Sequence, residues 1–138
     1  VSVDPGAYRV LIYADASMQS SSNSLAVTVK RPRVLLSTGW ETTFGDPSYF
    51  ASHPGFEPSL FPFLKNHGVV LFGVDMPSVK YGASDNATCH ADLLGAKIVI
   101  VESLWNLAHL PDEFFLSAAP LRMEGIDGSP IRAYAIVG

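Results

Sequence analysis

The sequence predicts a mixed α/β domain whose sheet contains strands of both directions and whose helices are short. Apolar runs of strand length, rich in β-branched residues, recur along the whole 138-residue chain. They outnumber the stretches with helical periodicity, and no regular alternation of strand and helix is visible. Apolar residues make up 48 % of the chain, which is enough for a hydrophobic core within one domain spanning residues 1–138.

The first two strands are expected at residues 8–15 and 33–38, because both are apolar runs with β-branched residues. The small polar residues 17–23 between them indicate a loop. Residues 40–55 are rich in glycine, proline, serine and aromatic side chains, so we expect a long ordered loop there. Long loops that carry aromatic residues often line binding sites.

A helix is expected to begin at Glu57–Pro58, where a proline in the first turn loses no hydrogen bond. It is expected to end at His67–Gly68, since glycine commonly follows a helix. Helical spacing predicts that its buried face consists of Phe56, Leu60, Phe63 and Leu64.

In the second half of the chain, residues 69–75 and 97–102 are expected to form buried strands that each end in an acidic residue. A short helix is expected at residues 91–94, between these two strands. Residues 114–119 and 132–137 are the last two predicted strands.

Composition disfavours several classes of function. The net charge is −4 and no basic stripe is present, so we expect no nucleic-acid partner. No apolar stretch approaches the roughly 20 residues that span a bilayer, so we expect no membrane partner either. The single cysteine excludes an internal disulfide framework and suits a reducing compartment, so we expect a cytoplasmic protein. Charged residues make up only 16 % of the chain, below the usual value of about 25 %, which suggests that some apolar surface is covered by another segment or chain.

His90 and Glu102 form the sharpest candidate pair. A short helix, a glycine turn and a strand separate them, and such a hairpin can bring its two ends together. An imidazole and a carboxylate could then bind one zinc or manganese ion. The spacing also arises by chance, and Glu102 could simply lie at an exposed strand end, so both interpretations remain open at this point.

Other polar residues favour structural roles. Asp75 is expected to accept backbone N–H groups of the turn at residues 76–78. Cys89 is expected to pack in the core, because no orienting partner for a cysteine nucleophile is evident. His67 at a helix end and His109 near the surface are interpreted as structural, whereas His53 could contact a substrate.

Aromatic residues gather between residues 40 and 50. Such a group can form the apolar wall of a pocket for a flat aromatic substrate. It can equally anchor the loop to the core. Its members are Trp40, Phe44, Tyr49 and Phe50.

Several segments resemble the metal-dependent cyclase family, which includes kynurenine formamidases and isatin hydrolases. VLLSTGW at residues 34–40 is similar to the family pattern V-L-L-R-T-G-W, and residues 68–78 are similar to G-V-x-x-x-G-x-D-T-P-S. Residues 90–104 match H-x-x-L-L-x-x-x-I-x-I-x-E-N-L. The loop at residues 46–55 and the last two predicted strands resemble the family as well, so the likeness covers nearly the whole chain.

The resemblance implies a swivelling β/β/α-type fold, a homodimer, and hydrolysis of amide or lactam bonds in small, often aromatic, substrates. It implies that His90 and Glu102 are metal-site residues. Our hypothesis is that both bind zinc or manganese and that Glu102 is also catalytic, because it could orient the attacking water. Trp40, Phe44, Tyr49, Phe50 and His53 would then bind the substrate. N-formylkynurenine, an intermediate of tryptophan catabolism, is the leading substrate and an isatin-like lactam is the next.

The chain departs from the family in one large way. The upstream motif H-x-G-T-H-x-D-x-P-x-H is absent, and residues 1–15 resemble the segment that follows it. The chain would thus correspond to the carboxyl-terminal two-thirds of the domain, and would need a complementing amino-terminal segment or chain. By itself it would be inactive, because a catalytic zinc needs about three protein ligands.

Two smaller departures concern the substrate. Lys80 stands where many relatives have an acid, and Ser103 replaces a common asparagine. The alternatives to a hydrolase completed by another segment are a non-catalytic binding or structural subunit, a degenerate relative that has lost its metal site, and a serine or cysteine enzyme.

Overall fold

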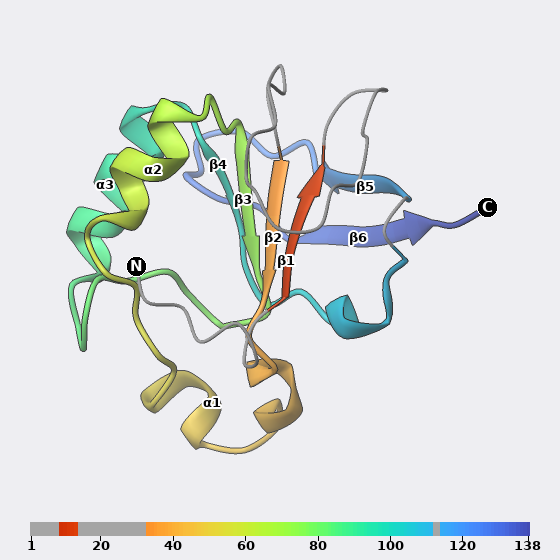
Figure 1. Ribbon diagram of the computed structural model, residues 1–138, viewed down its shortest axis with the longest axis horizontal. Coiled ribbons are helices and arrows are strands. Elements are labelled where there is room, and N and C mark those ends of the chain that lie inside the picture. The colour runs from red at the N-terminus through yellow and green to blue at the C-terminus, as the bar shows by residue number, and fades with distance from the viewer. Residues whose placement is uncertain (1–8, 14–32, 112–113) are drawn as a thin grey trace, which may run out of the picture. The chain divides into compact units, whose positions relative to one another are not determined.

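The computed structural model describes residues 9–13, 33–111 and 114–138 (Figure 1). The predicted loop at residues 17–23 lies outside the described residues. The chain divides into two compact units, one ending at Leu107 and the other starting at Ala108. Each unit is described by itself.

A four-stranded sheet forms the centre of the first unit, with strand order β1-β2-β3-β4. Strand β1 (Arg9–Tyr13) is antiparallel to β2 (Arg33–Ser37). Strands β3 (Leu71–Val74) and β4 (Val99–Val101) continue the sheet in parallel with β2. This arrangement confirms the predicted mixed α/β class and the first four predicted strands. The expected burial of the fourth strand is wrong in part, because Val99 in β4 is 54 % exposed.

Two helices connect the parallel strands and lie on the same side of the sheet (Figure 1). Helix α2 (Leu60–Asn66) joins β2 to β3, and helix α3 (Asn86–Gly95) joins β3 to β4. The 3₁₀ helix η1 (Trp40–Thr43) and the short helix α1 (Ser48–Ala51) lie beyond the lower end of the sheet as drawn, where β2 and β3 finish.

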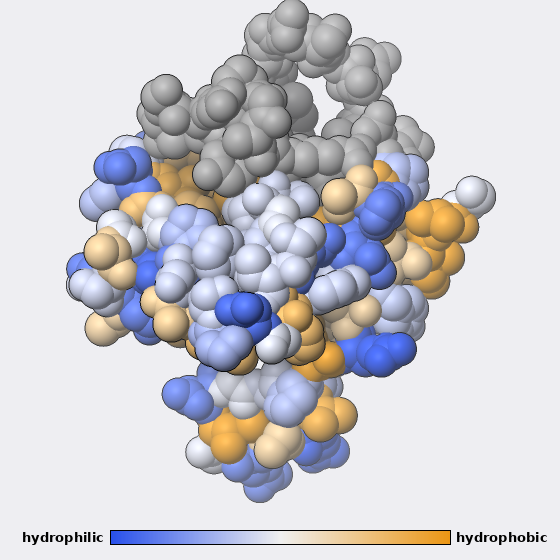
Figure 2. Space-filling view, turned by 90° about the horizontal axis from the view of Figure 1, so that it is seen from below, coloured by the Kyte–Doolittle hydropathy of each residue, from blue (hydrophilic) through white to orange (hydrophobic). Residues whose placement is uncertain are grey.

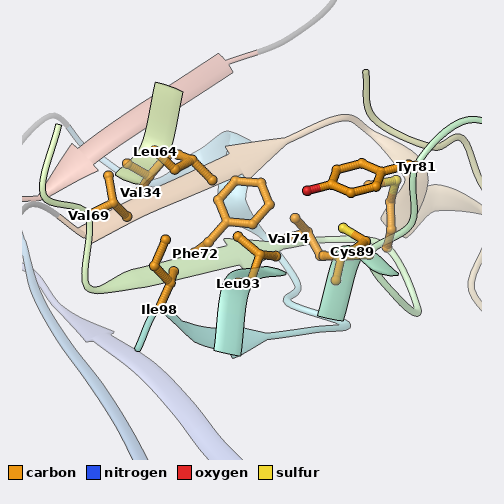
Figure 3. Packing of buried hydrophobic residues seen from close by; sticks show 11 residues of the cluster. Val34, Leu64, Val69, Phe72, Val74, Tyr81, Cys89, Leu93 and Ile98 are labelled. Carbon is orange, nitrogen blue, oxygen red and sulfur yellow. The ribbon is translucent and has the colours of Figure 1, made fainter. Parts of the chain in front are cut away.

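The core lies between the sheet and these two helices (Figure 3). Phe72 of β3 is 1 % exposed and Leu93 of α3 is 2 % exposed. Cys89, one turn before Leu93, faces the same core beside Val74 (Figure 3). Burying such apolar side chains stabilises the fold by about 1.5–3 kcal/mol each. The core therefore fixes α3 against the strands, and with it the polar face of α3 that carries His90.

Four details of the predicted loop and helices are wrong. Residues 40–55 contain η1 and α1 instead of being a loop throughout. Helix α2 begins at Leu60, later than the predicted Glu57–Pro58, and Phe63 is 42 % exposed instead of buried. Helix α3 is longer than predicted and begins at Asn86, because Asp85 caps it by accepting a hydrogen bond from Thr88 N at 3.1 Å.

The second unit is an antiparallel hairpin of β5 (Phe115–Pro120) and β6 (Ile131–Ile136). The Ser129 hydroxyl accepts a hydrogen bond from Leu121 N at 3.0 Å. A second 3₁₀ helix, η2 (Leu107–His109), contains the last residue of the first unit and the first two residues of the second. The two final predicted strands are confirmed.

Candidate functional site

The carboxyl ends of the parallel strands β2, β3 and β4 lie at one edge of the first unit's sheet (Figure 1). Thr38 directly follows β2, Asp75 follows β3 and Glu102 follows β4. Ligands of open α/β sheets commonly bind at this edge, because the loops there are free to carry polar residues. The candidate site is therefore built from residues near Glu102.

Asp75 connects two of these strand ends and is 0 % exposed. Its carboxylate accepts hydrogen bonds from Thr38 N at 2.9 Å, Thr38 Oγ1 at 2.6 Å and Gly39 N at 2.8 Å. The expected role as a hydrogen-bond acceptor is correct, but the expected partners are wrong. The donors lie after β2 and not in the turn at residues 76–78, because the neighbouring parallel strand brings them closer.

His90 and Glu102 lie side by side, as the spacing and the resemblance predict. His90 Nε2 is 3.2 Å from Glu102 Oε1, and the two side chains are 29 % and 33 % exposed. On its other side, the His90 ring contacts Asn86 O through Nδ1 at 3.0 Å. The imidazole is thus held by its own helix and presents Nε2 to the carboxylate.

Glu102 replaces Asp75 as the residue that closes the turn after β3. Its Oε1 accepts hydrogen bonds from Ser78 Oγ at 3.0 Å and from Val79 N at 3.2 Å. Asn86 donates to Ser78 Oγ at 2.6 Å and to Val79 O at 3.1 Å, which ties this turn to the start of α3. The carboxylate and the imidazole are therefore positioned by one connected set of hydrogen bonds.

The hydrogen bond to Asn86 O determines the chemistry of His90. A carbonyl oxygen only accepts, so Nδ1 carries the proton and neutral His90 presents the Nε2 lone pair to Glu102. A lone pair facing a carboxylate oxygen is repulsive. Either a proton on Nε2 or a cation held by both atoms removes this repulsion.

The donor set fits part of a zinc or manganese site. Imidazole nitrogen and carboxylate oxygen both bind zinc at roughly 2.0–2.2 Å, so two tetrahedral ligands lie about 3.3 Å apart. The observed 3.2 Å between His90 Nε2 and Glu102 Oε1 is close to this separation. Among the described residues, no group of three or more His, Cys, Asp or Glu could hold a metal ion. The pair could therefore supply only part of a ligand set.

His53 lies in the same electrostatic neighbourhood as Glu102 and is 8 % exposed. Burial and the positive charge of Lys80 lower the pKa of His53, while its hydrogen bond to Pro54 O and the charge of Glu102 act in the opposite direction. Lys80 itself is 9 % exposed. Two buried basic side chains thus accompany the carboxylate, and the sequence suggested a site role only for His53.

Two backbone segments hold His53 and Lys80 in place. Phe56 N donates to Lys80 O at 2.7 Å and Gly82 N donates to Phe56 O at 2.9 Å. Gly55 lies so close to Gly82 that a Cβ atom at residue 55 would overlap the Gly82 carbonyl. This close approach is possible because Gly55 has no side chain.

The predicted substrate-binding aromatics separate into exposed and buried members. Phe44 is 59 % exposed and Phe50 is 72 % exposed, whereas Tyr49 is 2 % exposed. Tyr49 packs edge-to-face against both, with ring centroids 5.2 Å and 5.0 Å away. Trp40 donates its indole N–H to Tyr49 O at 3.0 Å. Tyr49 therefore supports both exposed rings, and Trp40 holds the backbone of Tyr49.

The structure adds Trp105 to this group, which the sequence analysis missed. Its ring lies 5.5 Å from that of Phe44, edge-to-face, and it is 53 % exposed. We call Phe44, Tyr49, Phe50 and Trp105 the aromatic cluster. Tyr49 OH also donates to Ser103 Oγ at 3.1 Å, so the cluster contacts the segment that carries Glu102. The sequence feature that could have identified Trp105 is its position three residues after Glu102.

Cys89 and Glu41 are two further buried residues of the first unit. Cys89 is 1 % exposed, and burial foremost raises the pKa of its thiol to about 11. Its predicted packing role is confirmed, and a cysteine nucleophile is disfavoured. Glu41 is 8 % exposed, and its Oε2 is the one fully buried side-chain polar atom without a partner among the described residues.

The face seen in Figure 2 shows hydrophobic residues in small separate areas between hydrophilic ones. In the described part of the chain, no helix has the length and apolar character needed to cross a membrane.

Comparison with known proteins gives consistent matches. The family model described as "Putative cyclase" matches residues 12–81. The chain is 40 % identical over 105 residues to a kynurenine formamidase of Geobacillus thermodenitrificans, covering 73 % of this chain and 47 % of that protein. It is 35 % identical over 103 residues to a kynurenine formamidase of Polaromonas naphthalenivorans, covering 74 % of this chain and 44 % of that protein. The chain thus spans less than half the length of these relatives.

Proposed function

This chain belongs to the cyclase family, and on that premise we propose that it forms part of a metal-dependent hydrolase of amide or lactam bonds in small aromatic substrates. The relatives named kynurenine formamidase support an arylformamidase activity. The observation that carries the proposal is the approach of His90 Nε2 to Glu102 Oε1, at 3.2 Å, with Nδ1 already bound to Asn86 O.

In this proposal His90 and Glu102 hold a divalent metal, zinc or manganese, with further ligands from a segment or chain that completes the site. A metal held there would supply polarisation of the scissile carbonyl and a lower pKa for a bound water, so that hydroxide is available as the nucleophile. His90 contributes the Nε2 lone pair, because Asn86 O fixes the proton on Nδ1.

Glu102 is the proposed catalytic residue. Its Oε1 accepts both hydrogen bonds from the turn after β3. Its Oε2 accepts none from the described residues, so this oxygen is free to bind the ion or to accept a proton from the attacking water. The side chain is one-third exposed, which leaves room for that water.

The aromatic cluster is the proposed binding surface for the aryl group. Phe44 and Phe50 expose their rings, Tyr49 packs against both, and Trp40 holds the backbone of Tyr49. Flat substrates pack well against such rings. N-formylkynurenine is our first candidate substrate and an isatin-like lactam is the second. His53 would lie at the border between the aryl group and the reacting carbonyl.

The test is a co-expression of this chain with the part of the Geobacillus relative that the chain does not match. We expect co-purification, near-stoichiometric zinc or manganese, and release of formate from N-formylkynurenine. His90→Gln and Glu102→Gln should each lower metal affinity and formate release by about 100-fold or more. His109→Gln, at an exposed position, is the matched control.

The alternative is a non-catalytic binding or structural subunit. It predicts that the complemented protein contains no metal and releases no formate. Retention of full metal content in both His90→Gln and Glu102→Gln would also contradict the hydrolase proposal.

The same purified material would show whether the assembly contains two copies of the chain, which we propose from the resemblance to a homodimeric family. A reducing, cytoplasmic location remains part of the proposal, supported by the single cysteine.

A further inference from the structure

Lys80 has a buried side chain with an accessible charge. The residue is 9 % exposed, and its ammonium makes no hydrogen bond or ion pair with any described residue. It is nevertheless not fully buried, because in the described part of the chain Oε2 of Glu41 is the one fully buried side-chain polar atom without a partner. The lysine stem is therefore packed in protein while the ammonium reaches a point that solvent can enter.

The backbone on both sides of Lys80 is fixed. Val79 N donates to Glu102 Oε1 at 3.2 Å, so the preceding residue is tied to the candidate metal ligand. Lys80 O accepts from Phe56 N at 2.7 Å, and Gly82 N donates to Phe56 O at 2.9 Å. An ammonium on such a support loses little further freedom when a ligand binds, which favours affinity.

Among the described residues, no anion is paired with the Lys80 ammonium. The charges of Lys80 and Glu102 both influence the pKa of the buried His53, in opposite directions, so the three side chains lie near one another. Glu102 is directed toward His90 and toward the turn after β3, and it forms no ion pair with Lys80. An ammonium whose stem is packed in protein, and which has no anionic partner among the described residues, offers a charged hydrogen-bond donor to an incoming anion.

We propose that the Lys80 ammonium binds a carboxylate of the substrate, beside the His90–Glu102 pair. This inference rests on the proposed function, since it names the substrate class of the same site: an aromatic amide that carries a carboxylate. Within the described part of the chain, the Lys80 ammonium has no second cationic side chain paired with it, and a single ammonium fits a singly charged group. A phosphate would call for more positive charge than the described residues provide here.

The probe is a pair of flat ligands of nearly equal shape, anthranilate with a carboxylate and anthranilamide with a neutral amide. Their affinities for the 138-residue chain are measured by calorimetry, for the wild type, Lys80→Met and Lys80→Arg. Methionine keeps an apolar stem without charge, and arginine keeps the charge. The wild type should prefer anthranilate by about tenfold or more, Lys80→Met should lose that preference, and Lys80→Arg should keep most of it.

A second measurement on the wild type does not depend on the variants folding. The NMR signal of the Lys80 ε-methylene group should shift on addition of anthranilate and not of anthranilamide, and salt should weaken the anthranilate affinity alone. Equal affinity of the wild type for both ligands, or binding of neither, would overturn the proposal. So would a Lys80→Met variant that retains the wild-type preference.

Failure of this inference can be told from failure of the proposed function. In the complemented enzyme, formate release is compared for 2-formamidobenzoate and its neutral 2-formamidobenzamide analogue. If formate is released from both compounds at equal efficiency, and Lys80→Met does not change this, the carboxylate-site proposal is wrong and the hydrolase proposal stands. If formate is released from neither compound, but the anthranilate preference above is observed, the hydrolase proposal is wrong and the carboxylate-site proposal stands.

Discussion

Asp75 carries the densest set of hydrogen bonds at the sheet edge, with three donors from Thr38 and Gly39 and 0 % exposure. Asp75→Asn keeps the shape but replaces one acceptor oxygen by an NH₂ group that faces donors. Hydrogen bonds to a buried charged group are strong and costly to lose, so we expect about 3 kcal/mol less free energy of unfolding. Urea unfolding followed by circular dichroism measures the change.

Asp127→Asn is the control for Asp75, because Asp127 is exposed. It should change the free energy of unfolding by less than about 0.5 kcal/mol. A similar small change in Asp75→Asn would show that the three hydrogen bonds do not anchor the segment after β2.

His53 makes stability depend on pH. Burial foremost, and then the charge of Lys80, lower its pKa below the usual 6.5. The unfolded chain therefore takes up a proton at His53 at a higher pH than the folded chain does. The contribution to stability is complete above the unfolded pKa and is lost as the pH falls through the lowered folded pKa.

We therefore expect the wild type to lose stability between pH values of about 7 and 5 more steeply than His53→Gln, which has no titrating group there. Chemical unfolding at several pH values measures the two slopes. Identical slopes would mean that His53 is as easily protonated in the folded protein as in the unfolded one.

The residues of the site were predictable to different degrees. His90, in the middle of α3, and Glu102, directly after β4, could be found because they are only a helix half, a turn and a strand apart in the sequence. The partners of Asp75 could not be found, since they come from another strand. The burial of Lys80 and Glu41 could not be predicted either. Long charged side chains are usually exposed, and their burial depends on segments that are distant in sequence.

At the scale of elements, the contact between residues 53–56 and 80–82 determines where His53 and Lys80 lie. Gly55→Ala would place a Cβ atom on the Gly82 carbonyl, so the two backbones must separate. The bonds from Phe56 N to Lys80 O and from Gly82 N to Phe56 O would then be lost. We expect about 2 kcal/mol or more of destabilisation, measured by thermal unfolding, and loss of the anthranilate preference.

Gly128→Ala is the matched control, because no atom lies within 4 Å of a Cβ added there and its φ is not in the left-handed region. It should leave both stability and ligand preference near the wild type. A Gly55→Ala variant that behaves like this control would show that the two segments can separate without disturbing Lys80.

Strands were predicted more accurately than helices, for a physical reason. Runs such as the one in β4 are apolar and β-branched over their whole length, and this composition is itself the signal. Helix α3 has a mostly polar surface, so the sequence did not predict its first turn. The structure shows that this turn begins after Asp85, which caps the helix. The four-residue helices η1 and α1 are too short to show helical periodicity.

At the scale of the whole molecule, the sequence predicted a mixed sheet but not its strand order. The antiparallel pairing of β1 with β2, beside two parallel pairs, is a long-range arrangement. Local patterns carry no information on which strand is the neighbour. The resemblance to the cyclase family supplied an expectation for the whole fold, and the described part of the chain agrees with its mixed α/β class.

The two compact units differ in how well each buries its own strands. In the first unit, β3 lies between two neighbouring strands, and its Phe72 and Val74 are 1 % and 0 % exposed. In the second unit, the β5–β6 hairpin leaves Phe115 64 % exposed and Ile136 55 % exposed. A two-stranded hairpin is only marginally stable in water by itself.

We therefore expect the backbone amides of β5 and β6 to exchange with deuterated water about 100-fold faster than those of β3, since local opening is cheaper where little apolar surface is buried. Hydrogen exchange with mass spectrometry resolves the two regions as separate peptides. The complemented protein is the informative comparison. If a completing segment or a second copy covers the hairpin, its exchange should slow while that of β3 stays unchanged. Equal protection of both regions in the single chain would show that the hairpin already opens only together with the sheet of the first unit.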